Sequence, residues 1–352
     1  MHALFLAAAL LVGCLLAVQA SVNLQLNKAV GTPYGASTLQ LGVATALLAL
    51  LAIAVGAIGA IRLVPDAPFW HLLGGLASPL YITSGILLFP RLGALAAAGL
   101  FVTGQMFASL GLDLFGLLGI TRKPLSAGIA LGALAVLVGI TVIIRGQRPG
   151  KTSAQPGPAS GPVPGPASNS GGGSVRAAAA TVTAPARAAT TPSPSVKPGG
   201  LGQIGWIVLG IVAGGVLPVQ GAVNALLRDD VHQPLTTALI SFIVATITIA
   251  VVLLVLLALR RTPRPRFAPL STMPWWGWLG GACAAAYVTA TFTLIPTIGA
   301  ATTVALTVTG QQVASAVIDN YGLFRLPRRP LTTPRLTGLT LLIVGSVLVQ
   351  LT

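Results

Sequence analysis

The sequence predicts an all-α integral membrane protein with about ten transmembrane helices in two inverted five-helix repeats. Its composition excludes a soluble protein, because 54% of the 352 residues are hydrophobic and only 7% are charged, whereas soluble domains carry about 25% charged residues. Its apolar runs reach about 20 residues, the length of a membrane-spanning helix, and lack the alternating polarity of barrel strands. The same polar residues also recur in the same order in both halves of the chain.

Hydropathy places five membrane spans in each half of the chain. They are helical because a helix in hydrocarbon pairs its backbone polar groups within itself. Between the halves, residues 149–200 form a Pro, Ala, Gly, Ser and Thr tract with little to bury, which predicts a disordered linker. The chain thus divides into a first membrane repeat at 1–148 and a second at 201–352. The predicted spans run near Leu4–Leu24, Ala36–Ile61, Phe69–Phe89, Leu92–Leu118 and Ser126–Ile144, and near Ile204–Leu226, Leu235–Leu259, Trp275–Ile295, Ile298–Asn320 and Leu336–Leu351.

The two halves are repeats of one unit. The first span of each half carries the pattern Gln-x-x-x-Asn, at Gln19 and Asn23 and again 201 residues later at Gln220 and Asn224. From the third span onward the offset is 206 residues, and the change falls in a loop, where insertions are tolerated. At this offset the residues Tyr81, Gln105, Ser109 and Asp113 match Tyr287, Gln311, Ser315 and Asp319.

An odd number of spans per repeat fixes how the repeats are related. With five spans in each half, both ends of the linker meet the same face of the membrane, so the second repeat enters inverted. Inverted repeats are a transporter architecture, in which the substrate is held near the midplane between the repeats. The repeat pattern therefore predicts alternating access to a cavity between the two halves.

The basic residues predict which face is cytoplasmic. The net charge of +15 comes from Lys and Arg between the spans, so it is not the footprint of a nucleic-acid-binding protein. Cytoplasmic loops concentrate these residues, which favours a cytoplasmic linker with both termini outside. The linker face holds Lys28, Arg91, Arg145, Arg148, Arg260, Arg261, Arg264, Arg266, Arg325, Arg328 and Arg329, and the opposite face holds Arg62, Arg122, Lys123 and Arg228.

These motifs resemble the YdcZ-type family of bacterial inner-membrane proteins within the drug/metabolite transporter superfamily. The likeness rests on Gln-x-x-x-Asn in the first span, the proline that follows it, and Gln-x-x-x-Ser-x-x-x-Asp-x-x-Gly in the fourth span. The family unit is about half of this chain, which resembles a tandem fusion of two units. The resemblance implies a transporter of a small metabolite or drug-like molecule in the bacterial plasma membrane, with export as the favoured direction. It also implies both termini in the cytoplasm, opposite to the charge count.

The paired polar residues of the spans are the candidate substrate-binding groups. Residues four apart share one face of a helix, as do Gln19 with Asn23 and Gln220 with Asn224. Amides in hydrocarbon are costly unless they are paired. They either join helices by hydrogen bonds or line a cavity and bind substrate, and the spacing allows both. The candidate set is completed by Tyr81, Gln105, Ser109, Tyr287, Gln311 and Ser315.

Asp113 and Asp319 are the carboxyl-bearing residues within the predicted spans. Such a group is a functional hypothesis by default, and a proton-driven transporter needs a carboxyl of this kind. The alternative is a structural contact with the basic residues of the next loop, which are Arg122 and Lys123 in the first half and Arg328 and Arg329 in the second. Both aspartates lie close to these loops, which favours the structural interpretation.

The sequence predicts no enzyme, cofactor or metal site. It contains no HExxH or GxSxG motif, and Cys14 and Cys283 lack the spacing of metal ligands. The expected partners are the lipid bilayer and a small-molecule substrate, and no second subunit is required because both repeats lie in one chain. The alternative to transport is a membrane scaffold or sensor whose intramembrane polar residues are structural.

Overall fold

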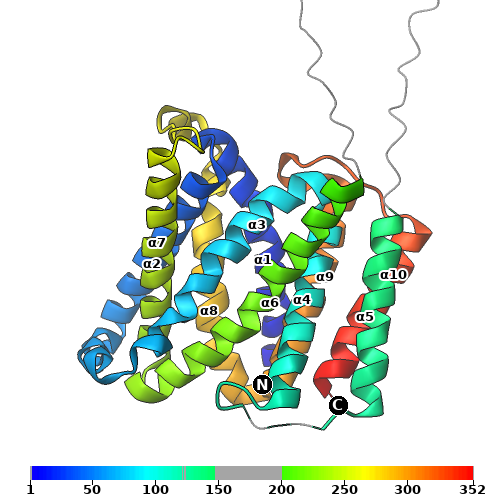
Figure 1. The fold of residues 1–352 in the computed structure, drawn as a ribbon, viewed down its shortest axis with the longest axis horizontal. Coiled ribbons are helices and arrows are strands. Elements are labelled where there is room, and N and C mark those ends of the chain that lie inside the picture. Colours follow the sequence, from blue (N-terminus) through cyan, green and yellow to red (C-terminus); the bar gives the residue numbers. More distant parts are fainter. Residues whose placement is uncertain (1, 121, 123, 147–199, 352) are drawn as a thin grey trace, which may run out of the picture.

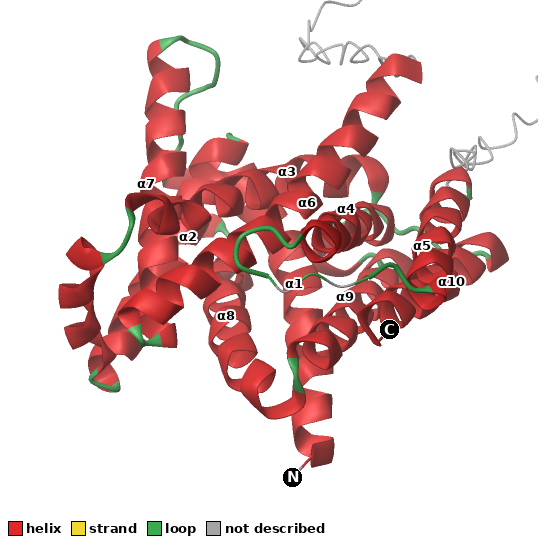
Figure 2. Cartoon of the chain, turned by 60° about the horizontal axis from the view of Figure 1, so that its bottom comes forward, coloured by secondary structure: helices red, strands yellow, loops and turns green. Residues whose placement is uncertain are grey.

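The computed structural model describes residues 2–120, 122, 124–146 and 200–351, and these residues form a bundle of ten α-helices. Each predicted span overlaps one of these α-helices, and Figure 2 shows how the helices are arranged. The predicted linker lies outside the described residues apart from Gly200, which begins the sixth helix. The first unit contains α1 (His2–Val30), α2 (Pro33–Ala54), α3 (Ala77–Leu92), α4 (Ala94–Phe115) and α5 (Ala127–Arg145), and the second contains α6 (Gly200–Val231), α7 (Pro234–Ala258), α8 (Leu279–Ile298), α9 (Ala300–Tyr321) and α10 (Thr333–Leu351).

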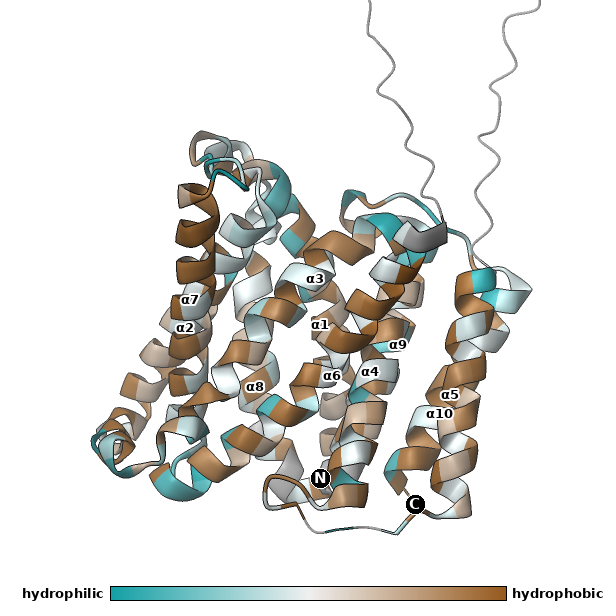
Figure 3. Ribbon diagram, in the orientation of Figure 1, coloured by the Kyte–Doolittle hydropathy of each residue, from teal (hydrophilic) through white to brown (hydrophobic). Residues whose placement is uncertain are grey.

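The helices are those of a membrane protein. Eight of them are long and apolar enough to cross a membrane, judged by length and composition, and α8 and α9 complete the bundle beside them. Short 3-10 helices lie between the α-helices at Ala57–Asp66 (η1), Phe69–Leu76 (η2), Ala268–Thr272 (η3), Trp275–Trp278 (η4) and Leu323–Arg325 (η5). The third span of each unit therefore begins as a 3-10 helix, η2 or η4, and continues as an α-helix. Figure 3 shows the hydrophobic residues along the helices and the hydrophilic ones gathered towards their ends.

The second unit is inverted relative to the first, as predicted. Figure 1 shows both termini at one end of the bundle, whereas α5 ends and α6 begins at the opposite end. We call these two ends the terminal side and the linker side. The inversion follows from the odd number of helices in each unit, because five passes leave the chain on the face opposite to its start.

The two units are interleaved rather than stacked as separate bundles. The first helix of each unit packs on the third and fourth spans of the other, so that α1 contacts α8 and α9 while α6 contacts η2, α3 and α4. The helices α2 and α7 pack together, as do α5 and α10. Each of these contacts maps onto itself or onto its counterpart when the units are exchanged, which is the signature of two-fold pseudosymmetry.

Glycines allow the interleaved helices to approach at backbone distance. A Cβ on Gly104 of α4 would lie 1.9 Å from the carbonyl oxygen of Ile211, and one on Gly310 of α9 would lie 2.0 Å from that of Leu10. These two contacts are equivalent, because each pairs corresponding residues of the two units. Small residues at helix contacts are typical of membrane bundles, where close packing replaces the hydrophobic effect as the source of helix association.

We predict that Gly104→Ala and Gly310→Ala each lower the thermal stability of the purified protein in detergent. The added methyl group meets backbone, which cannot rotate away, and overpacking of this kind typically costs about 1–3 kcal/mol. Gly42→Ala in α2 is the matched control, because nothing lies within 4 Å of its Cβ position and alanine favours a helix by roughly 0.5–1 kcal/mol. A Gly310→Ala protein as stable as the control would show that α1 and α9 are not in backbone contact.

Candidate functional site

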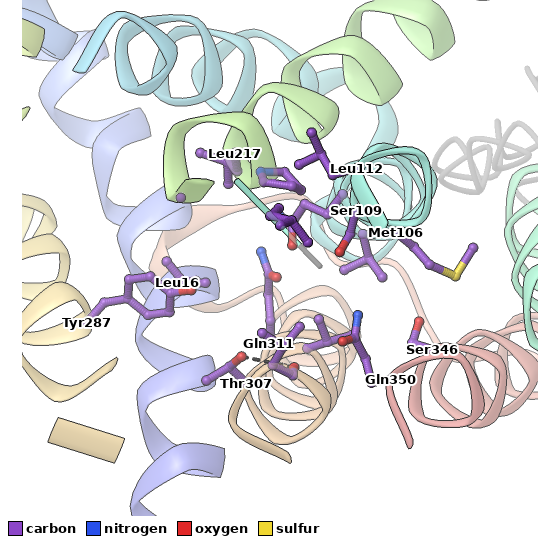
Figure 4. Close-up of a pocket in the computed structure, with 17 residues that line it drawn as sticks. Leu16, Met106, Ser109, Leu112, Leu217, Tyr287, Thr307, Gln311, Ser346 and Gln350 are labelled. Atoms are coloured by element: carbon purple, nitrogen blue, oxygen red, sulfur yellow. Dashed lines mark hydrogen bonds between the residues drawn. The ribbon is translucent and has the colours of Figure 1, made fainter. Parts of the chain in front are cut away.

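A cavity of about 280 Å³ lies between the two units, with walls from α1, α4, α6, α8, α9 and α10. Figure 4 shows Tyr287 of α8 beside Leu16 of α1, with Gln311 of α9 between them and Ser109 of α4. Four predicted binding residues line this cavity, namely Gln105, Ser109, Tyr287 and Gln311. Thr307, Ser346 and Gln350 add further hydrogen-bonding groups that the sequence reasoning did not single out.

The cavity lies on the axis that relates the two units. Three pairs of counterparts contribute both of their members to its wall, and they are Leu16 with Leu217, Val102 with Val308, and Gln105 with Gln311. Two corresponding residues, one from each unit, can line the same space only if that space lies close to the two-fold axis that relates the units. This cavity therefore lies between the two halves, where the sequence predicts the substrate site, and binding of a substrate there stays a prediction.

The cavity extends towards the terminal side and is closed on the linker side. Ile120, in the loop after α4, and Gln350, near the end of α10, belong to its wall. In the opposite direction α4 is fully packed, since every residue from 94 to 104 is buried. In α9 the residues from Gln311 to the end of the helix include Gln312, Ser315 and Asp319, all 1% exposed or less.

Tyr81 and Tyr287 are counterparts in sequence but occupy different environments. Tyr287 lines the cavity, whereas Tyr81 is buried behind it and packs on Phe101 with ring centroids 4.7 Å apart. The amide nitrogen of Gln311 donates to the Tyr81 hydroxyl oxygen at 3.2 Å. In this conformation Tyr81 thus positions a cavity residue and does not itself reach the cavity.

The Gln-x-x-x-Asn pairs lie at the contact between the units, outside the cavity wall. Gln220 donates to the Ser78 hydroxyl at 2.8 Å, and Asn224 donates to the Ser241 hydroxyl at 3.1 Å. Gln19 and Asn23 are also buried, at 5% and 2% exposure. For Gln220 and Asn224 the geometry shows hydrogen bonds that join helices, and a role of all four amides in substrate binding stays a prediction.

Glycines in the third span of each unit accommodate the asparagines. A Cβ on Gly74 would lie 2.3 Å from the Oδ1 of Asn224, and one on Gly280 would lie 2.0 Å from that of Asn23. Each asparagine amide therefore occupies the space left by a missing side chain in the other unit. This explains why the glycine and the asparagine recur together in both halves.

Asp319 joins α9 to the first unit on the linker side. Its Oδ1 accepts from the backbone N–H of Ala94 at 2.7 Å, and its Oδ2 accepts from that of Leu95 at 3.2 Å. These are the first residues of α4, where the helix dipole favours negative charge. The Nη2 of Arg335 also donates to Oδ2, at 2.5 Å, and both side chains are nearly completely buried.

The expected partners of Asp319 were wrong in one respect. The sequence pointed to Arg328 and Arg329. The backbone N–H of Arg329 does donate to the carbonyl oxygen of Asp319 at 2.6 Å, but Arg328 donates to the carbonyl oxygen of Asn320 at 2.9 Å. The ion-pair partner is Arg335, in the first turn of α10, which the loop after α9 brings back alongside Asp319. Arg335 is 3% exposed, and its Nη1 also donates to the carbonyl oxygen of Arg329 at 2.7 Å.

Asp113 is not held in the same way on the terminal side. It is partly exposed, and Arg122, its expected partner, donates instead to the carbonyl oxygen of Leu114 at 2.9 Å. Lys123 lies outside the described residues. The glycine before α9, Gly299, has none of the described residues within 4 Å of its Cβ position, whereas the Cβ position of its counterpart Gly93 is 2.8 Å from the Oδ2 of Asp319. Among the described residues, the same contact is therefore closed at one end of the molecule and open at the other.

The sequence profile of one protein family matches both units separately, over residues 4–142 and 205–348. The description of that family reads "Putative inner membrane exporter, YdcZ". The chain belongs to this family. It contains the YdcZ unit twice, which confirms the tandem fusion inferred from the repeats. The family match supports a multi-pass inner-membrane protein and, in general terms, a transporter.

A solved crystal structure of another protein is similar to this YdcZ-family chain. It aligns over 98% of this chain and 94% of its own, with a TM-score of 0.51 and 17% sequence identity. At that identity the likeness concerns the fold alone. The search of curated proteins gives no match.

We predict that Arg335→Ile lowers the stability of the protein strongly, because it leaves the Asp319 carboxylate buried without its counter-ion. Removing one partner of a buried ion pair typically costs about 3–5 kcal/mol. The double variant Asp319→Asn/Arg335→Ile should recover much of the loss, since it buries no unpaired charge. Thermal unfolding in detergent measures both, with the exposed Arg328→Ile as control. Equal effects of Arg335→Ile and Arg328→Ile would contradict the buried pair.

Proposed function

We propose that this YdcZ-family protein transports a small uncharged molecule by alternating access between its two inverted units. The observation that carries the proposal is the cavity on the pseudo-two-fold axis, which extends towards one side of the bundle and is closed on the other. A cavity of this kind holds a substrate near the midplane, and rocking of the units about it exchanges the accessible side.

The cavity wall suggests the class of substrate. Its described polar groups are the amides of Gln105, Gln311 and Gln350 together with hydroxyls such as those of Ser109 and Thr307. The rest of that wall is mainly aliphatic, and none of its described residues is charged. Amides and hydroxyls both donate and accept hydrogen bonds, so they suit an uncharged amphipathic molecule. The volume lies near the lower end of the range for small-molecule sites, which favours a metabolite-sized ligand.

Basic residues on the linker side support export as the direction of transport. The chain ends and loops on this side carry Lys28, Arg91 and Arg145, together with the run from Arg260 to Arg266 between α7 and η3. If the positive-inside tendency holds, the linker side faces the cytoplasm and the cavity in this structure faces outward. An exporter would then be captured here in the conformation that releases its substrate.

One observation favours the alternative, a scaffold or sensor without transport. The amides of Gln220 and Asn224 are used in hydrogen bonds between helices, which is what purely structural polar residues would do. That explanation does not extend to Gln105 and Ser109, which face the cavity. A scaffold has no need for a polar cavity on its symmetry axis.

We predict that liposomes containing the purified protein move at least one member of a panel of radiolabelled uncharged metabolites. Gln105→Leu and Gln311→Leu should each reduce that flux about fivefold, because one lost hydrogen bond is worth roughly 1 kcal/mol and about 1.4 kcal/mol is a factor of ten. Gln203→Leu, an exposed amide on α6, is the matched control. Folded protein that moves no compound, with or without the substitutions, would favour the scaffold.

We also predict the orientation. With Cys14 and Cys283 replaced by alanine, a membrane-impermeant maleimide added to intact cells should label Ala3→Cys on the terminal side. It should not label Ser271→Cys, an exposed residue of η3 on the linker side. The reverse pattern would place both termini in the cytoplasm, as the family resemblance implies, and would turn the outward-facing cavity into an inward-facing one.

A further inference from the structure

Beyond the cavity, α9 carries polar side chains that are buried without a partner. Gln312 and Ser315 are both 0% exposed, and neither the amide of Gln312 nor the hydroxyl of Ser315 has a hydrogen-bond partner among the described residues. The two residues are three apart, so they are neighbours on one face of the helix. Buried polar groups are nearly always satisfied by protein, water or ligand, and an unsatisfied amide therefore calls for an explanation.

The counterparts of these residues in the first unit explain them. At the 206-residue offset, Gln312 corresponds to Met106 and Ser315 corresponds to Ser109. Met106 and Ser109 both line the cavity. Tyr287 likewise lines it, whereas its counterpart Tyr81 is buried. One member of each pair therefore faces the cavity, and the other is packed on the linker side of it.

The two ends of the molecule differ in the same sense. On the linker side Asp319 is bonded to the start of α4 and to Arg335. On the terminal side the described residues show no hydrogen bond or ion pair for Asp113, and none of them lies within 4 Å of the Cβ position of Gly299. We call the contact of Asp319 with Arg335 and the first residues of α4 the linker-side gate. It closes the half of the path in which Gln312 and Ser315 are packed.

We propose that Gln312 and Ser315 line a second binding site, which opens to the linker side when the linker-side gate separates. The inference rests on the proposed function and deepens it, because it specifies the site of the opposite conformation. In that conformation the roles of the counterparts exchange, so that Tyr81 lines the site and Ser109 becomes packed. The site takes an uncharged group that donates and accepts hydrogen bonds, since an amide and a hydroxyl form its wall.

The second site differs from the observed cavity in one residue that matters chemically. Gln312 stands where the first unit has Met106, so the linker-side site has an amide at the position of a thioether. The unpaired amide disfavours the present conformation, because its hydrogen-bonding groups lose water without gaining a partner. Opening to the linker side exposes the Gln312 amide to water or to substrate, where it finds hydrogen-bond partners. The free energy gained in this way offsets the loss of the contacts at Asp319. A ligand shifts the equilibrium by its difference in affinity between the two conformations.

Cysteine reactivity tests the second site without any substrate. In the full chain with Cys14 and Cys283 replaced by alanine, Ser315→Cys is exposed to a membrane-impermeant maleimide from the linker side of membrane vesicles. We expect slow labelling, which becomes at least tenfold faster when Asp319→Asn/Arg335→Ile removes the ion pair of the gate. Ser109→Cys, labelled from the terminal side, should become slower in the same background. Arg328→Ile, on the same loop but exposed, is the control and should change neither rate.

A second variant separates a moving site from a loosened fold. Gln312→Met gives the second unit the residue of the first and removes the unpaired amide, so it should favour the present conformation. In the Asp319→Asn/Arg335→Ile background it should slow the labelling of Ser315→Cys several-fold, whereas a merely loosened fold would label equally fast with either residue. Unchanged labelling of Ser315→Cys in the gate variant, in protein that unfolds cooperatively, would overturn the inference. If liposomes still transport a compound in that case, only the second site is rejected. If instead Ser315→Cys labels faster and Ser109→Cys slower in the gate variant, but no compound is transported, transport is rejected and the second site is retained.

Discussion

Backbone contact between the first helix of each unit and the fourth helix of the other holds the whole arrangement together. Gly104 and Gly310 remove the side chains that would otherwise keep α6 from α4 and α1 from α9. Because each unit contributes one helix to each contact, neither unit can bury its own interface alone. Interleaving of this kind also fixes the symmetry axis between α4 and α9, the two helices that carry the glutamines of the cavity. The position of the cavity is thus a consequence of how the helices are allowed to approach.

Differences between the two halves give this symmetric scaffold a direction. Asp319 finds Arg335 and the start of α4, whereas Asp113 has Ile129 at the position that corresponds to Arg335. A single repeat that pairs with a second copy of itself would have to build both ends from one sequence. Fusion of two units in one chain lets each end have its own residues, so the closing contact on the linker side contains an ion pair that the terminal side lacks. The conformation seen here, closed where that ion pair lies, follows from this difference.

Much of the fold could be predicted from the sequence, because hydropathy and repeat spacing depend on local composition and on counting. The site was predictable only in part. A spacing of four places Gln19 with Asn23, and Gln105 with Ser109, on similar polar stripes, yet only Gln105 and Ser109 face the cavity. Whether such a stripe faces the cavity or another helix depends on which helix packs opposite it, and the sequence pattern does not show this. Arg335 was missed because the loop between α9 and α10, rather than any local pattern, returns it to Asp319. Gln312 was missed for a different reason: the repeat was recognised through identical residues, and here the halves differ.

The central claim is that the two ends of the molecule open alternately, as inverted copies of each other. Distances between pairs of spin labels, measured by pulsed electron resonance in lipid nanodiscs, test it most directly. One pair, at Arg91 and Arg328, spans the linker side, and its counterpart pair, at Thr297 and Arg122, spans the terminal side; all four residues are exposed. Alternating access predicts two distance populations for each pair. In the native sequence the short linker-side distance is favoured. In Asp319→Asn/Arg335→Ile the linker-side pair should shift to its long distance while the terminal-side pair shifts to its short one. A single unchanged distance at each end, or lengthening at both ends together, would contradict it.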